Sequence, residues 1–264
     1  MTHTLRTRVM RWPSPDAARI GDVDVKVYVA SLLADDDRLE RAVGVLSRAE
    51  RERFDSYSNG VVSRRFAMGR AILREILGAL SSISASAVRI VDGTYGKPAL
   101  APLAGGPSLR FSVAHCDDLL LVAVSRNGEV GVDVERMRSI DCWERVADRT
   151  LAPAERARLV REVERGEAPD EVFLRYWCRV EAELKAIGCG IHGIEAHRAG
   201  ERPAGLRVAD LHDLPLPGDL ESTASRYQAA VALCDPASPS SRQSTRAANQ
   251  PDSPTSTPAR ASTP

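Results

Sequence analysis

Hydrophobic and polar residues alternate along several short stretches of the chain, and this period of two predicts β-strands. In the first stretch, 23–29, valine occupies every second position. Further strands are predicted at 88–91, 109–113, 119–124, 130–135 and 228–234. The stretches 119–124 and 228–234 are almost entirely apolar, so we expect them to lie in the interior of a sheet.

Between the strands the hydrophobic period lengthens to that of an amphipathic helix. The clearest helix is predicted at 64–77, and we expect Gly78 to end it. Another helix is expected to begin at Pro153, because proline suits the first turn of a helix. A long helix is predicted at 170–187, with Gly188 as its stop.

These elements predict an α+β fold. The apolar strand at 119–125 resembles the one at 228–234 in length and character. We therefore expect two similar α/β subdomains in a pseudo-dimer, an N-terminal half at 1–127 and a C-terminal half at 128–234. They would meet near Asn127-Gly128, a sequence typical of a β-hairpin turn. Residues 235–264 contain no aromatic residue and no aliphatic residue larger than alanine, so we predict a disordered tail.

Composition narrows the class of protein. Lysine and arginine total 36 and aspartate and glutamate total 36, and this balance argues against a general nucleic-acid binder. The chain has no run of about 18 apolar residues, so no membrane span is expected. The N-terminus lacks the apolar region of a secretory signal. The five cysteines form no CxxC pair, and this argues against a zinc site and against a disulfide framework. We therefore expect the protein in the reducing cytoplasm.

Asp133 and Glu135 lie two positions apart on the predicted strand 130–135, so their side chains share one face. Two neighbouring carboxylates repel each other unless a cation lies between them. A site made only of oxygen atoms favours magnesium, which commonly takes one or two carboxylates and completes its shell with water and phosphate. The alternative is an ordinary solvated strand face.

Trp177, Glu181 and Lys185 fall at positions i, i+4 and i+8 of the long predicted helix. They therefore share a face, on which Trp177 would pack against the core while the two charged residues point into a cleft. The alternative is a surface ion pair beside a core tryptophan.

His115 follows a predicted strand, and its alternative interpretation is a hydrogen-bonded loop histidine. It does not pair well with Cys116 as a nucleophile and base, because neighbouring residues on an extended chain point in opposite directions. Arg53, Arg65 and Lys97 belong to basic segments that are suited to bind phosphates. For most arginines of these segments a solvated helix face is the simpler interpretation.

Four motifs occur in a specific order and spacing: YGKP at 95–98, FSVAH at 111–115, GVDVE at 131–135 and WCRVEAELK at 177–185. Together they resemble the 4′-phosphopantetheinyl transferase superfamily. The resemblance covers about 23–234, and the chain length resembles the surfactin-type branch, in which two similar halves form a pseudo-dimer.

The resemblance implies a magnesium site in which the pyrophosphate of coenzyme A completes the metal shell. Its protein ligands would be Asp133, Glu135 and Glu181. Lys185 matches the family lysine near the transferred phosphate, and Glu155 matches, more loosely, a further acidic residue near the site. The proton acceptor stays open between Glu181, Glu155 and a magnesium-bound water.

The resemblance also implies a binding site for coenzyme A. His115 and Arg65 match residues that contact its 3′-phosphate, and Arg53 would join them. Lys97 matches the lysine of the YGKP turn, which contacts the cofactor as well.

The implied reaction moves 4′-phosphopantetheine from coenzyme A to a serine of an apo acyl or peptidyl carrier protein. The products are the holo carrier and adenosine 3′,5′-bisphosphate. We expect a cytoplasmic monomer that serves polyketide or nonribosomal-peptide biosynthesis. Two alternatives remain: a magnesium enzyme that hydrolyses nucleotides, such as a pyrophosphatase, and a non-catalytic relative that only binds coenzyme A or a partner.

Three positions depart from the family pattern. Ser112 stands where asparagine is common, Ala114 where serine is common, and Val180 where lysine is usual before the metal-binding glutamate. We expect the loss of one hydrogen bond to the cofactor and weaker phosphate contacts. No departure removes a predicted metal ligand.

Overall fold

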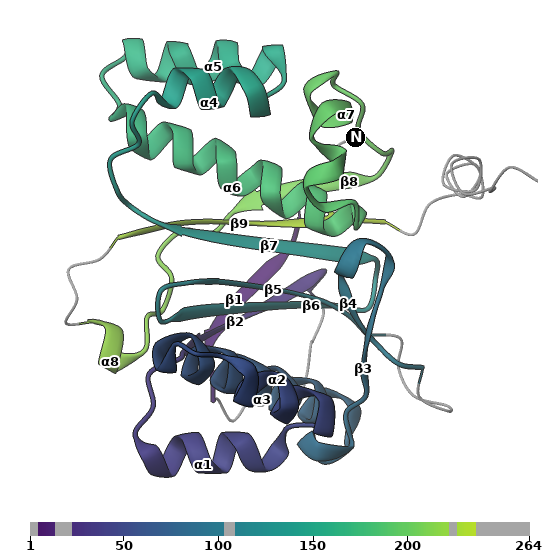
Figure 1. Ribbon diagram of the computed structural model, residues 1–264. Coiled ribbons are helices and arrows are strands. Elements are labelled where there is room, and N and C mark those ends of the chain that lie inside the picture. Colours follow the sequence, from purple (N-terminus) through teal and green to yellow (C-terminus); the bar gives the residue numbers. More distant parts are fainter. Residues whose placement is uncertain (1–4, 14–22, 103–108, 222–225, 236–264) are drawn as a thin grey trace, which may run out of the picture.

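The computed structural model describes residues 5–13, 23–102, 109–221 and 226–235. Two sheets pack face to face, and helices cover the outer face of each, so the molecule has four layers (Figure 1). The α+β prediction is confirmed. The predicted tail lies outside the described residues from 236 onward. No described helix has the length and apolar character needed to cross a membrane.

The first sheet has the strand order β1-β2-β6-β5. Its strands are β1 (Thr7–Arg11), β2 (Val25–Ser31), β5 (Arg110–Cys116) and β6 (Leu119–Ser125). Strands β1 and β2 are parallel, and the other pairs are antiparallel. Both faces of β2 are buried: Tyr28 packs toward the outer helices, while Val27 packs toward the second sheet.

Three helices cover the outer face of the first sheet: α1 (Asp36–Val45), α2 (Arg48–Ser56) and α3 (Gly60–Ser81). Helix α3 continues beyond Gly78, where the sequence predicted its end, and terminates at Ser82 in the left-handed conformation (φ 57°). Gly78 has a different role, because a Cβ there would lie 2.8 Å from the Ile83 carbonyl oxygen. It lets the chain fold back closely onto the end of the helix.

A small hairpin follows α3 after a short 3₁₀ turn (Ala85–Ala87). It consists of β3 (Ile90–Asp92) and β4 (Pro98–Leu100), which are antiparallel and joined through a second 3₁₀ turn, Thr94–Gly96.

The second sheet has the order β7-β9-β8, with β7 (Glu129–Arg136), β8 (Leu206–Asp210) and β9 (Tyr227–Cys234). Asn127-Gly128 therefore leads from one sheet to the other, and the hairpin predicted there is wrong. A Cβ on Gly128 would lie 2.3 Å from the Cys234 carbonyl oxygen, so the glycine allows β9 to pass close by. The similarity of the two halves stays a prediction.

Helix α6 (Pro169–Ile187) covers the outer face of the second sheet, and α4 (Trp143–Thr150) and α5 (Pro153–Glu164) pack on the far side of α6. Helix α6 ends at Gly188 in the left-handed conformation, as predicted. It is followed by a 3₁₀ turn (Gly190–Gly193) and α7 (Ile194–Arg198), and α8 (Gly218–Glu221) precedes β9.

Helix α6 lies unusually close to β7. A Cβ on Gly131 would stand 1.9 Å from the Ala182 carbonyl oxygen and 2.4 Å from the Ala186 nitrogen. The contacting surfaces are built from small residues, Ala182 and Ala186 on the helix and Ala230 and Ala232 on β9. This close approach brings polar side chains of α6 next to those of β7.

Strands β5 and β7 are edge strands of different sheets and lie side by side. Hydrogen bonds from backbone amides of β7 to side chains of β5 link the two strands. The Val132 amide donates to Ser112 Oγ at 3.2 Å, and the Arg136 amide donates to Cys116 Sγ at 3.3 Å. The two strands are therefore fixed in register by the side chains of Ser112 and Cys116.

Candidate functional site

The predicted carboxylates of β7 lie on the face that α6 covers. Asp133 is buried, and its Oδ1 accepts a hydrogen bond from Lys185 Nζ at 2.6 Å. Its other oxygen, Oδ2, is buried without a hydrogen-bond partner. Glu135 accepts a hydrogen bond from Arg138 at 2.7 Å. A buried carboxylate oxygen without a partner is costly, and Oδ2 is therefore open to a further hydrogen-bond donor or cation.

Glu181 of α6 belongs to the same cluster. Burial raises the pKa of Glu181, the positive charge of Lys185 lowers it, and the charges of Asp133 and Glu135 raise it again. The carboxylates of β7 and α6 are thus close enough to repel one another. Trp177, one turn earlier on the shared face, packs against the core formed with α4 and α5.

The donor set fits a hard divalent cation. Three carboxylates offer oxygen ligands only, and the free Oδ2 of Asp133 is oriented into the protein rather than to solvent. Within the described residues, no group of three or more histidine, cysteine, aspartate or glutamate side chains is already arranged to hold a metal ion. Lys185 and Arg138 instead neutralise two of the carboxylates. The assignment of the metal ligands stays a prediction.

A cavity of about 310 Å³ opens beside α3 and brings together three of the residues predicted to bind the cofactor, Arg53, Arg65 and His115. Its remaining lining is mainly apolar and includes Tyr57 and Phe66, whose rings lie 5.4 Å apart. The cavity can therefore receive a flat ring and an attached anion together.

His115 connects this cavity with the carboxylate cluster. Burial lowers the pKa of His115, and the positive charges of Arg65 and Lys185 lower it further. His115 thus lies within electrostatic reach of one cation in the cavity and another on α6. Arg65 is oriented by Asp118, which accepts two hydrogen bonds at 2.8 and 3.1 Å.

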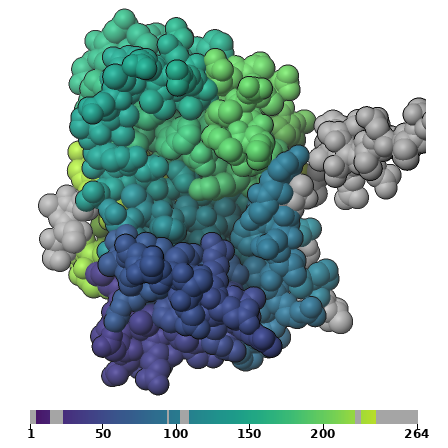
Figure 2. All heavy atoms as spheres, in the orientation of Figure 1, coloured from purple at the N-terminus to yellow at the C-terminus, as the bar shows by residue number. Residues whose placement is uncertain are grey.

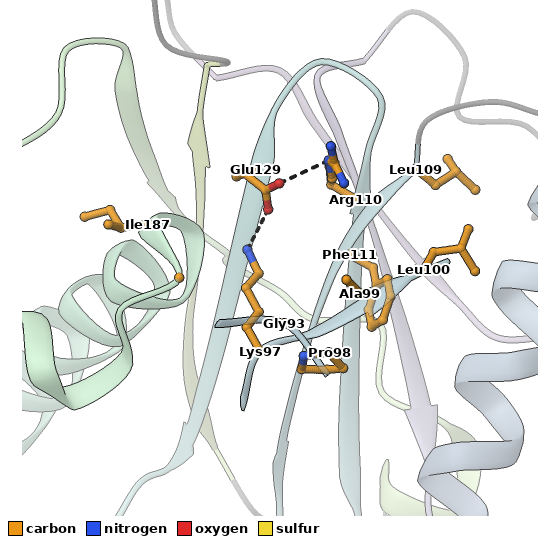
Figure 3. Close-up of a pocket in the computed structure, with 11 residues that line it drawn as sticks. Gly93, Lys97, Pro98, Ala99, Leu100, Leu109, Arg110, Phe111, Glu129 and Ile187 are labelled. Atoms are coloured by element: carbon orange, nitrogen blue, oxygen red, sulfur yellow. Dashed lines mark hydrogen bonds and ion pairs between the residues drawn. The ribbon is translucent and has the colours of Figure 1, made fainter. Parts of the chain in front are cut away.

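Lys97 lies elsewhere. Its ammonium group donates to Glu129 at 2.9 Å and lines a separate cavity of about 210 Å³ together with Arg110 (Figure 3). The next residue, Pro98, lines both cavities. The structure therefore does not bring the Lys97 ammonium together with Arg53, Arg65 and His115.

Glu155 is also held apart from the β7 carboxylates. Its partners are the Ala152 amide at 3.1 Å, His197 Nε2 at 2.9 Å and Arg202. His197 is buried and also lies 3.4 Å from Glu183, which neighbours Glu181 in sequence but points to another side of α6. This cluster joins α5, α6 and α7, and a catalytic role of Glu155 stays a prediction.

The His197 cluster predicts a loss of stability in alkali. Burial lowers the pKa of His197, but its contacts with Glu155 and Glu183 raise it to about 9. Because this value exceeds the unfolded value of about 6.5, the charged histidine stabilises the fold fully below about pH 6.5 and loses this effect as the pH rises through about 9. We expect the free energy of unfolding to fall by roughly 2 to 3 kcal/mol between pH 6 and 10 relative to the His197→Gln variant. Urea unfolding of both proteins across this range measures it, and parallel pH profiles would refute the assignment.

Comparison with known proteins identifies the family. A model of the 4′-phosphopantetheinyl transferase superfamily matches residues 129–232, which include β7 and α6. The 4′-phosphopantetheinyl transferase HetI of Nostoc sp. is 31% identical over 200 residues, which cover 75% of this chain and 84% of HetI. The chain belongs to this superfamily.

Other relatives of the superfamily match over shorter stretches. The 4′-phosphopantetheinyl transferase AcpT of Salmonella typhimurium is 35% identical over 129 residues, 49% of this chain and 61% of AcpT. The L-aminoadipate-semialdehyde dehydrogenase-phosphopantetheinyl transferase of Rattus norvegicus is 25% identical over 60% of this chain and 52% of its own length. The chain thus spans somewhat more than half the length of these two relatives.

Two of the three departures from the superfamily pattern, Ser112 and Val180, have structural explanations, and Ala114 has none. Ser112 is buried and uses its hydroxyl to accept the Val132 amide. Val180 is fully buried in the core between α6 and the helices α4 and α5, where a lysine would have to leave its charge in apolar surroundings. Ala114 lies between Ser112 and Cys116 on β5 and offers no side-chain acceptor.

Restoring serine at Ala114 is expected to stabilise the fold by about 1 kcal/mol. Alternate amides of an edge strand point the same way, so the Val134 amide points toward β5 like those of Val132 and Arg136. A serine hydroxyl at position 114 would meet it. Chemical unfolding of Ala114→Ser and of the wild type measures the gain. Equal or lower stability of the serine variant would argue against this account.

Two polar residues of the site were missed from the sequence. Arg138 forms an ion pair with Glu135. The two residues are three positions apart in the sequence, and this spacing is a signal that could have suggested the pair. Glu129 holds Lys97, and it shares by strand alternation the face of Asp133 and Glu135. Following the alternate positions from Asp133 toward the start of β7 would have led to Glu129.

Proposed function

We propose that this protein transfers the 4′-phosphopantetheine group of coenzyme A to a serine hydroxyl of an apo carrier protein. The products are holo carrier protein and adenosine 3′,5′-bisphosphate. The observation that supports it most is the cluster of Asp133, Glu135, Glu181 and Lys185, together with the charge of Lys185 acting on His115 of the cavity that also holds Arg53.

Coenzyme A fits this arrangement by its chemistry. Its adenine ring would enter the largely apolar part of the cavity near Tyr57 and Phe66, and its 3′-phosphate would meet Arg53, Arg65 and His115. Its pyrophosphate would then lie toward Lys185, whose charge already reaches His115.

Asp133, Glu135 and Glu181 are the residues that would hold Mg²⁺, with the coenzyme A pyrophosphate as a further ligand. Bound there, Mg²⁺ would neutralise negative charge on the pyrophosphate oxygens. Lys185 donates a hydrogen bond to Asp133. With a metal ion on Asp133 instead, the Lys185 ammonium would be free to bind the phosphates.

Transfer then needs orientation and charge stabilisation more than covalent help. The serine oxygen attacks the β-phosphorus, the bond from that phosphorus to the bridging oxygen breaks, and adenosine 3′,5′-bisphosphate leaves with the bonding electrons. We propose that a water molecule takes the serine proton, because Asp133, Glu135 and Glu181 would be engaged with the metal and Arg202 holds Glu155.

The Lys185→Ala variant is expected to lower kcat by about a hundredfold and to change the KM for the carrier little. The reason is that the lysine stabilises charge on the leaving group, which develops in the transition state. Steady-state kinetics at saturating coenzyme A and Mg²⁺ measure both constants. A rise in carrier KM with unchanged kcat would place Lys185 in the protein interface instead.

The decisive assay is intact mass spectrometry of a panel of apo carrier proteins, mixed with this protein, coenzyme A and Mg²⁺. We expect one carrier or more, with polyketide and nonribosomal-peptide carriers as the first choice, to gain the mass of one phosphopantetheine group. Cleavage of coenzyme A without a carrier would favour a nucleotide hydrolase. Carrier binding without a mass gain would favour a non-catalytic binding protein.

A further inference from the structure

The polar face of β7 begins with Glu129, four residues before Asp133. Its carboxylate accepts Lys97 Nζ at 2.9 Å on one oxygen and Arg110 Nε at 3.0 Å on the other (Figure 3). The side chain of Lys97 is only 19% exposed, although that of Glu129 is 45% exposed. Glu129 therefore anchors a partly buried lysine from a distant segment.

Lys97 also contacts the end of α6. Its ammonium lies 3.4 Å from the Ala186 carbonyl oxygen in the last turn of that helix, where carbonyl groups attract a cation. The lysine stem also passes Gly188, which ends α6: a Cβ there would be in ordinary contact with Lys97 Cδ, at 3.7 Å. The ammonium group thus has a carboxylate and a helix terminus as partners.

Backbone hydrogen bonds link Lys97 to the turn that precedes it. The Gly93 amide donates to the Lys97 carbonyl at 2.8 Å, and the Gly96 amide donates to the Gly93 carbonyl at 3.1 Å. A Cβ on Gly93 would lie 2.5 Å from the Lys97 carbonyl oxygen, so the turn is tightly closed. Pro98, which follows directly, is part of the wall of the cavity that holds Arg53 and His115.

We propose that Glu129 is a positioning residue that fixes the 93–98 turn against the C-terminus of α6 through Lys97. On this account Lys97 acts by holding one wall of the nucleotide cavity in place beside the helix of Glu181 and Lys185. Its ammonium is not a ligand of a coenzyme A phosphate. The part of this inference that concerns coenzyme A rests on the proposed function, whereas the ion pair itself can be tested without any ligand.

The structural test is amide hydrogen exchange of the full chain without ligand. We expect Lys97→Met and Glu129→Gln each to accelerate exchange in 93–98 about tenfold, and the double variant to exchange no faster than either single variant, because both changes remove the same pair. Glu195→Gln, at an exposed glutamate of α7, is the matched control. Unchanged exchange in both single variants, or additive acceleration in the double variant, would overturn the ion-pair anchor even if the protein never bound coenzyme A.

The functional test is calorimetric titration of the same proteins with coenzyme A. We expect Glu129→Gln to weaken binding about three- to tenfold, although Glu129 itself is not placed against the ligand. Lys97→Met and the double variant should bind about as weakly as Glu129→Gln, because all three lose the same anchor. If Glu129→Gln binds normally while Lys97→Met binds poorly, then Lys97 contacts a phosphate directly and the inference fails. Absence of wild-type binding would instead contradict the proposed function.

Discussion

Replacing Asp133 with asparagine should lower kcat/KM by about a thousandfold while the protein stays folded. The substitution keeps the shape of the side chain and removes the charge that would hold the divalent ion and that now pairs with Lys185. Loss of one preorganised electrostatic contact at a reacting centre costs roughly 100- to 1000-fold in rate, and here the metal is lost with it. Mass-spectrometric rates at several Mg²⁺ concentrations measure the effect.

The control for this variant is Asp219→Asn, at an exposed position of the short helix α8. Thermal unfolding of both proteins checks that they are folded. Because Asp133 Oδ2 is buried without a hydrogen-bond partner, neutralising this residue should cost little stability. A near-normal rate of Asp133→Asn at saturating Mg²⁺ would refute the assignment of Asp133 as a metal ligand.

Gly131→Ala should be the most destabilising glycine-to-alanine substitution among the described residues. The new Cβ would meet the backbone of α6 at Ala182 and Ala186, which cannot yield as a flexible side chain could. We expect a loss of about 3 kcal/mol or more in the free energy of unfolding. The Gly131→Ala molecules that still fold should transfer phosphopantetheine slowly, because a displaced α6 would carry Glu181 and Lys185 away from Asp133.

The matched control is Gly44→Ala in α1, where an added Cβ has no heavy atom within 4 Å. Alanine there should stabilise the helix by roughly 0.5 to 1 kcal/mol. Urea unfolding compares the two variants directly. If Gly131→Ala were as stable as Gly44→Ala, the close packing of α6 on β7 would not exist as described.

The helices and strands, and the faces on which their side chains lie, could be predicted from the sequence because they depend on residues close together in the chain. Strand alternation placed Asp133 and Glu135 on one face, and helix periodicity placed Glu181 and Lys185 on another. What the sequence alone could not show is how closely those faces meet, since that depends on Gly131 opposite Ala182. The metal-ligand roles themselves came from the family resemblance.

The features that the sequence did not predict involve partners far away along the chain. Asn127-Gly128 has the composition of a hairpin turn, but β7 pairs with β9, about a hundred residues later, and so enters another sheet. Lys97 shows no preference for Glu129 in the sequence, because the pair spans 32 residues and exists only once the sheets pack. Figure 2 shows the β3–β4 hairpin leaning against the surface of the C-terminal helices, a contact that no local pattern predicts.

The binding of Mn²⁺ in place of Mg²⁺, followed by the ³¹P resonances of coenzyme A, tests the central claim most directly. Three carboxylates around one ion that also touches the diphosphate predict strong broadening of the two diphosphate resonances by substoichiometric Mn²⁺ in the wild type. The broadening should be largely lost in both Asp133→Asn and Glu181→Gln. Equal broadening in the wild type and in these variants, or no protein-dependent broadening at all, would contradict the account.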